Sequence, residues 1–141
     1  MSNEKEQSMN TDQITLWNIQ NYALAQIFDF VKGKLLEQNR QALGTDGTCF
    51  YRGDGGRKCA IGHLIPDEKY TPEMEYNGIG DIIRLRGLCN IDETRLTLLR
   101  LLRDLHDENL PEEWPECFDN LERLGVRDGE LENPFSKNWR K

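Results

Sequence analysis

Long hydrophobic runs are missing from this sequence. No stretch approaches the roughly 20 apolar residues that a membrane-spanning helix needs. Residues 1–10, MSNEKEQSMN, are polar and have no apolar centre of the kind found in a signal peptide. We therefore expect a cytoplasmic protein that does not bind a membrane, with residues 1–10 forming a disordered tail.

Positive charge is also scarce. The 141 residues include 18 Lys and Arg against 25 Asp and Glu, which gives a formal net charge of −7. Non-specific binding to nucleic acid needs clustered Lys and Arg that neutralise phosphates. The composition therefore argues against direct contact with nucleic acid, and it suits a protein that meets a basic surface on a partner.

Potential metal ligands are few. The chain has four cysteines and two histidines, and free thiols are expected in a reducing cytoplasm. Zinc sites usually contain close pairs such as C-x2-C, and this sequence has none. We expect no cofactor. The alternative is a zinc site or a cysteine-dependent active site, or a small-ligand site, built from Cys49, Cys59, His63 and His106.

Phosphate-binding signatures are lacking as well. Residues 53–58, GDGGRK, match neither G-x4-G-K-[ST] nor a G-x-G-x-x-G that opens a helix. A tight turn explains these glycines better, because glycine adopts positive φ at little cost. With no catalytic motif, we expect a binding protein rather than an enzyme.

Helical periodicity dominates what is present. Leu24, Ile27, Phe28, Val31 and Leu35 recur on one face of a helix that the pattern predicts from residue 11 or 12 to about residue 41. Shorter helices are predicted over residues 71–77 and 79–88. Longer ones are predicted from the Asn90–Glu93 cap to about residue 108, and over residues 111–125.

Two short segments have strand-like composition. Residues 48–52, TCFYR, and 57–61, RKCAI, flank the glycine-rich turn and predict a β-hairpin. We also predict a polar contact between Arg52 and Asp67. The fold class expected is mainly α (α+β), with about four to five helices packed around a small β-hairpin. A single domain is expected over residues 11–125, followed by a C-terminal tail over 126–141.

Negative charge is concentrated in one part of the chain. Between Asp104 and Glu122 there are eight carboxylates and no Lys or Arg. Solvated helix faces are the simplest interpretation. The alternative is an acidic surface for a basic partner, to which the tip of the predicted hairpin would add a carboxylate. The candidate partner-binding residues are Asp104, Asp107, Glu108, Glu112, Glu113, Glu116 and Asp54.

One motif has a wider resemblance. Its residues are Cys49, Tyr51, Arg52, Gly53, Gly56, Cys59, Ala60, Gly62, Leu64, Ile65, Pro66, Asp67 and Tyr70, followed by His106, Asp107 and Trp114. The sequence C-x-Y-R-G-x-x-G-x-x-C-A-x-G-x-L-I-P-D resembles a group of small uncharacterised proteins of phages, prophages and bacteria. Relatives of this kind often carry Cys at the place of His63, which would preserve a metal-ligand type.

The resemblance implies a role in phage biology. Small acidic phage proteins commonly act by covering a surface of a host protein. The expected function is therefore to bind, and modulate or inhibit, a host protein with a basic surface, such as a nucleic-acid-handling or defence enzyme, in the host cytoplasm. The metal, cysteine-enzyme or small-ligand alternative stays open at this point.

Overall fold

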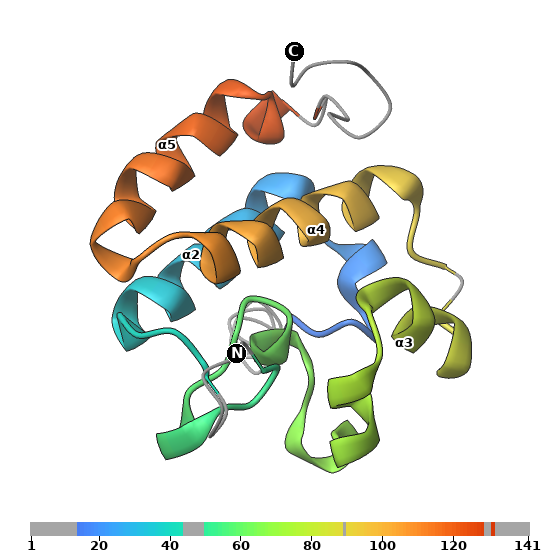
Figure 1. Cartoon of the computed structure of the whole chain (residues 1–141). Helices are drawn as coiled ribbons and strands as arrows, with labels where there is room; N and C mark the ends of the chain where they lie inside the picture. The colour runs from blue at the N-terminus through green and yellow to red at the C-terminus, as the bar shows by residue number, and fades with distance from the viewer. Residues whose placement is uncertain (1–13, 44–49, 89, 129–130, 132–141) are drawn as a thin grey trace, which may run out of the picture.

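The computed structural model describes residues 14–43, 50–88, 90–128 and 131. Four α-helices lie in these ranges: α2 Leu24–Gln38, α3 Ile79–Leu85, α4 Glu93–Glu108 and α5 Trp114–Arg123. The 3-10 turns are Ile19–Asn21, Asp54–Gly56, Gly62–Leu64, Asp67–Lys69, Pro72–Tyr76, Pro111–Glu113 and Val126–Asp128. In Figure 1, α4 runs alongside α2, with α5 on one side of this pair and residues 50–78 on the other.

The pair α2 and α4 forms the centre of the core. The buried residues of α2 are Leu24, Ile27, Phe28, Val31 and Leu35, so its predicted apolar face is confirmed. Helix α4 buries residues on more than one side, because it packs against α2 and also against α5. Burial of these large apolar side chains is the main source of stability for the fold.

Helix α5 covers the pair through aromatic contacts. Trp114 and Phe118 are fully buried, and the ring of Phe118 meets Phe28 of α2 edge to face, with 5.7 Å between centroids. Gly125 follows α5 with a φ of 100°, a conformation that glycine adopts readily at the end of a helix. The buried side chain of Val126 then returns the chain to α2.

The predicted helical start before residue 24 is wrong. One local and one long-range hydrogen bond divert the backbone of residues 14–23: the Thr15 N–H donates to Asn18 Oδ1 over 2.8 Å, and the Leu16 N–H donates to the distant Leu64 carbonyl over 2.9 Å. Side chains such as Asn that accept from nearby backbone compete with helix formation. Helix α2 therefore begins only at Leu24.

The predicted β-hairpin is also wrong, and with it the α+β class. No β-strand occurs within the described residues, where Arg52 and Lys58 form only an isolated antiparallel bridge. The turn between them is a 3-10 turn, Asp54–Gly56, and the chain enters another at Gly62. A ladder cannot extend because its backbone groups are used elsewhere: the Phe50 N–H donates to the Ala42 carbonyl.

None of the helices in these described ranges has the length and apolar character needed to cross a membrane.

Candidate functional site

The segment from residue 50 to residue 78 is organised by one carboxylate. Glu75 Oε1 accepts from the backbone N–H of Tyr51 over 2.9 Å, and Oε2 accepts from the backbone N–H of Arg52 over 3.1 Å. The Tyr70 hydroxyl donates to Oε2 over 2.6 Å. Glu75 thus substitutes for a partner strand, since hydrogen bonds to a charged acceptor are stronger than those to a neutral one.

Arg52 joins the same segment at three points. Its Nη1 pairs with Asp67 over 2.8 Å, its Nη2 donates to the Ile65 carbonyl over 2.8 Å, and the guanidinium lies 4.6 Å from the centre of the Tyr70 ring. The predicted contact between Arg52 and Asp67 is therefore confirmed. Asp67 is largely exposed, so this ion pair contributes little energy by itself.

His106 is a structural residue. Its side chain is fully buried, Nε2 accepts from the backbone N–H of Ala42 over 3.0 Å, and the ring stacks on Trp114. Because Nε2 accepts, the proton of the neutral ring lies on Nδ1, which is 2.6 Å from Asp107 Oδ1. Both nitrogens are occupied, so this imidazole cannot act as a metal ligand without breaking the packing around Ala42.

Cys59 is not positioned as a nucleophile. Burial raises the pKa of its thiol to about 12, while the backbone N–H of Gly62, which donates to Sγ over 3.3 Å, opposes this rise. The thiolate is the reactive form of cysteine. At neutral pH, Cys59 is therefore an inert, packed thiol.

A metal centre finds no support in the described part of the chain. Within residues 14–43, 50–88, 90–128 and 131, no three His, Cys, Asp or Glu side chains gather closely enough to hold an ion. Cys59, His63 and His106 are described and do not form such a group. Cys49, the remaining candidate, lies outside the described residues.

The predicted acidic set separates into two groups. Asp104 and Asp107 are half-buried, and they contact Arg103 and His106 respectively. In contrast, Glu108, Glu112, Glu113 and Glu116 are exposed. The side chain of Asp54 is not among those that the structure describes.

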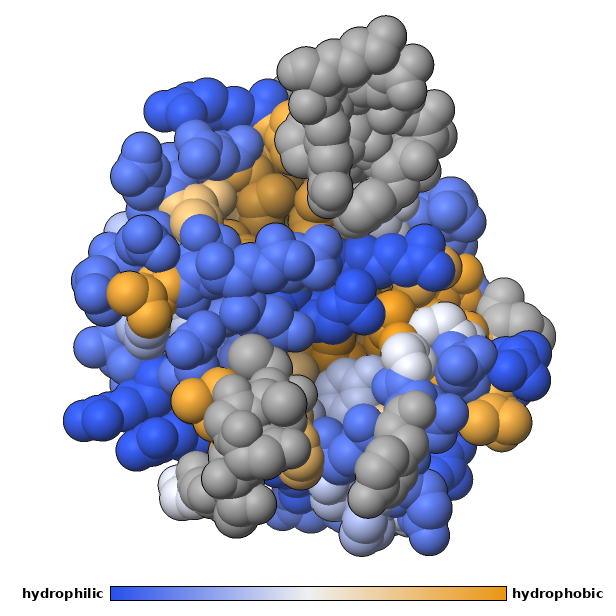
Figure 2. Space-filling view, viewed as in Figure 1, coloured by the Kyte–Doolittle hydropathy of each residue, from blue (hydrophilic) through white to orange (hydrophobic). Residues whose placement is uncertain are grey.

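The exposed acids continue along α5. Asp119, which was not among the predicted partner-binding residues, lies one turn after Glu116 and is also exposed. None of the five forms an ion pair with a described Lys or Arg, and Glu113 accepts from the backbone N–H of Leu110. We name Glu108, Glu112, Glu113, Glu116 and Asp119 the acidic ridge. Figure 2 shows that hydrophilic side chains dominate the surface over α4 and α5 on the face in view.

Three of the grooves that described residues line adjoin these elements. The largest, of about 790 Å³, lies between α2 and residues 56–69, and it contains His63 together with Lys34, Lys58 and Lys69. A second, of about 370 Å³, lies beside Tyr51 and Cys59. A third, of about 330 Å³, places Glu112 of the acidic ridge near Arg40 and Arg57.

Sequence reasoning found His63 but missed its neighbours in the largest groove. The three lysines come from separate segments: Lys34 lies on α2, Lys58 in the bridge with Arg52 and Lys69 in a 3-10 turn. Single lysines scattered in this way form no motif in the sequence. Two aromatic residues, Trp17 and Phe30, also line the groove. Both side chains are half-buried.

Comparisons with family models, with curated proteins and with solved structures found no match for this chain.

Proposed function

We propose that this protein is a non-enzymatic binding protein of the phage type, which uses the acidic ridge to bind a basic surface of a host protein in the host cytoplasm. A nucleic-acid-handling or defence enzyme is the class of partner that we propose, because its phosphate-binding cleft can accept carboxylates. The observation that carries the proposal is that five exposed carboxylates lie close in sequence, without an ion pair to a described Lys or Arg.

The position of these charges supports a role beyond helix stability. Acidic residues near the start of α5 suit the positive end of its dipole, so Glu112, Glu113 and Glu116 have a local benefit. Glu108 is different, because it ends α4, where the helix dipole disfavours a negative charge. A basic partner would relieve this unfavourable charge, and complementary charge would raise the rate of association.

The test compares two variants of equal net charge. The first is Glu112→Gln, Glu116→Gln and Asp119→Asn. The second, as a control, is Glu73→Gln, Asp81→Asn and Glu93→Gln, which are exposed acids on other elements. Each triple variant loses three negative charges, so the formal net charge goes from −7 to −4 in both variants.

Tagged wild type and both variants are used to capture proteins from a bacterial lysate, with quantification by mass spectrometry at two salt concentrations. We expect one partner to be captured in similar amounts by the wild type and the control. The ridge variant should capture at least tenfold less of it, and high salt should release it from all three proteins. Equal retention of every captured protein by the two variants would contradict the proposal.

A further inference from the structure

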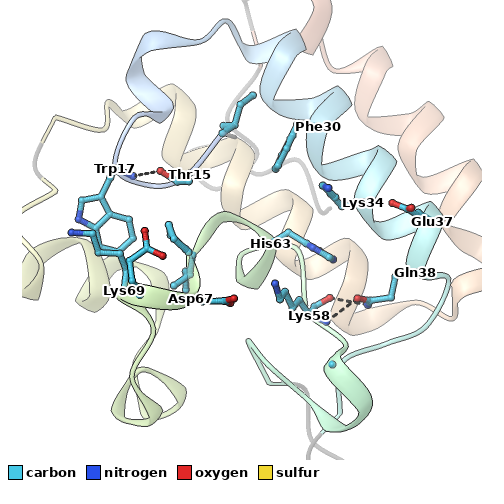
Figure 3. Close-up of a pocket in the computed structure, with 15 residues that line it drawn as sticks. Thr15, Trp17, Phe30, Lys34, Glu37, Gln38, Lys58, His63, Asp67 and Lys69 are labelled. Atoms are coloured by element: carbon cyan, nitrogen blue, oxygen red, sulfur yellow. Dashed lines mark hydrogen bonds between the residues drawn. The ribbon is translucent and has the colours of Figure 1, made fainter. Parts of the chain in front are cut away.

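The largest groove has two walls of different origin. Phe30, Lys34, Glu37 and Gln38 recur at helical spacing on one face of α2 and form the first wall. Residues 56–69 form the second, which Gln38 attaches to α2: its Oε1 accepts from the Lys58 N–H over 2.8 Å, and its Nε2 donates to the Lys58 carbonyl over 2.8 Å. This bidentate contact fixes the groove as a feature of the fold (Figure 3).

Three ammonium groups border the groove without carboxylate partners. Lys34, Lys58 and Lys69 form no ion pair with any described residue. Of the acids at the groove, Asp67 is neutralised by Arg52 at 2.8 Å. Glu37 and Glu68 then face three lysines, which leaves a local positive excess in a protein of net charge −7.

His63 supplies an unfilled hydrogen-bonding position among these cations. Among the described residues, its Nε2 is buried from solvent and has no hydrogen-bond partner, an arrangement that costs free energy. In Figure 3, His63 projects between the labelled side chains of Lys34 and Lys58. Burial, followed by the charges of Lys58 and Lys34, lowers the pKa of His63 to about 4, so the ring is neutral at pH 7 and Nε2 can donate when it carries the ring proton.

Aromatic surface lies beside this cationic region. Lys69 lies 5.4 Å from the centre of the Trp17 ring, and Lys34 lies 5.5 Å from that of Phe30. Figure 3 shows Trp17 and Lys69 at one end of the groove and Lys34, Lys58 and Gln38 at the other. A ligand with a planar ring and an anionic group at opposite ends would match both.

We propose that this groove, the lysine cleft, binds a small phosphate monoester with a planar ring, of the mononucleotide class. Its phosphate would lie among Lys34, Lys58 and His63 Nε2, and its ring against Trp17. Lysine ammonium groups are common ligands for phosphate, and aromatic faces stack on bases without regard to sequence. The lysine cleft shares no residue with the acidic ridge, so either proposal can fail without affecting the other.

The test is a titration followed by NMR, with AMP, ribose 5-phosphate, inorganic phosphate and adenosine as separate probes. We expect saturable binding of AMP, weaker binding of ribose 5-phosphate and inorganic phosphate, and no saturable binding of adenosine. AMP should shift the ¹⁵N resonance of His63 Nε2 and leave the nitrogen resonances of the buried His106 unchanged.

Two variants assign the site. Lys34→Met with Lys58→Met should weaken AMP binding at least tenfold, and Trp17→Ala should weaken binding of AMP but not of inorganic phosphate. The control compares two single changes that each remove one positive charge: Lys34→Met should weaken AMP binding, whereas Lys32→Met, on the same helix but beside Phe28 and Phe118, should change affinity less than twofold. Amide spectra of each variant confirm that it is folded.

Three outcomes would overturn the proposal. The first is no saturable binding of any phosphorylated probe at millimolar concentration. The second is binding of adenosine as tightly as AMP, which would exclude a phosphate site. The third is an equal loss of affinity in the Lys32→Met control, which would show that AMP responds to overall charge rather than to the cleft.

Discussion

The imidazole of His106 and the backbone of Ala42, 64 positions apart in sequence, are joined by a buried hydrogen bond of 3.0 Å from the Ala42 N–H to Nε2. This bond fixes the chain that leaves α2 against the last turn of α4. Gln41 strengthens the junction, because its Nε2 donates to the His106 carbonyl over 3.0 Å. A residue that the sequence offered as a metal ligand or catalytic base is therefore part of the packing.

We expect His106→Phe to destabilise the fold. The variant keeps an aromatic ring beside Trp114 but leaves the Ala42 N–H buried without an acceptor, which costs about 1–3 kcal/mol. The free energy of unfolding, measured with urea, checks this. Asp107→Asn is the control, because its amide oxygen can still accept from Nδ1–H, and it should cost less than half as much. Equal stability of His106→Phe and wild type would contradict the structural role.

Two glycine substitutions should have opposite effects. A Cβ on Gly62 would lie 2.0 Å from the carbonyl oxygen of Tyr51, whereas a Cβ on Gly33 would meet nothing within 4 Å. Gly62→Ala must therefore move backbone and should cost about 2 kcal/mol or more. Gly33→Ala lies in α2 and should stabilise the protein by about 1 kcal/mol, since Ala is the better helix former. Thermal unfolding shows whether each variant is more or less stable than the wild type. Higher stability of both variants would be evidence against the close packing at Gly62.

Thiol reactivity should differ between two described cysteines. Cys59 is buried with a pKa raised to about 12. Cys117 is only half-buried, and burial followed by the charges of Glu113 and Glu116 raises its pKa. Labelling of the native protein with iodoacetamide at pH 8, with peptide mapping, should modify Cys117 much faster than Cys59. Equal rates in native protein, as expected in urea, would show that Cys59 is accessible.

His63 should make stability depend on pH in the acid range. Its pKa is about 4 in the folded protein and 6.5 in the unfolded chain, because burial, then Lys58, Lys34 and His106, disfavour its charged form. Between these values the unfolded state binds more protons, so stability is fully present above pH 6.5 and falls as pH decreases towards 4. Once the pH is below 4, the loss attributable to this group is on the order of 3 kcal/mol.

The measurement compares wild type with His63→Gln, which cannot titrate, by urea unfolding at several pH values between 4.5 and 7. The wild type should lose more stability than the variant over this interval, and NMR titration of the His63 ring should give its pKa directly. Parallel curves for the two proteins would show that His63 is not buried as described.

The apolar face of α2 could be predicted from sequence because it rests on a local period. Leu24, Ile27, Phe28, Val31 and Leu35 repeat at helical spacing, and a helix with such a stripe must bury it. The same rule located α4 and α5. It failed for residues 14–23, where an Asn side chain and the distant Leu64 carbonyl take the backbone donors.

The path of residues 50–78 could not be predicted in this way. The composition of residues 48–52 and 57–61 suits strands, and the N–H groups of Gly53 and Cys59 do donate to the carbonyls of Arg57 and Tyr51. Glu75, however, accepts from the N–H groups of Tyr51 and Arg52, and no ladder forms among the described residues. Only the contact between Arg52 and Asp67 was anticipated. A contact with a carboxylate more than twenty residues away cannot be predicted from the local residue pattern of residues 48–52.

The sequence by itself determined the helices, the apolar faces that they bury and the excess of negative charge, because these depend on neighbours within a turn or two and on composition. Tertiary structure alone decided which polar side chains are available to a ligand. It placed both nitrogens of His106 in hydrogen bonds within the packing, and it left Nε2 of His63, which lies beside Lys34 and Lys58, buried without a hydrogen-bond partner among the described residues. The physical reason is that a hydrogen-bond partner is chosen by distance in space, and residues far apart in the chain meet only once the core has formed.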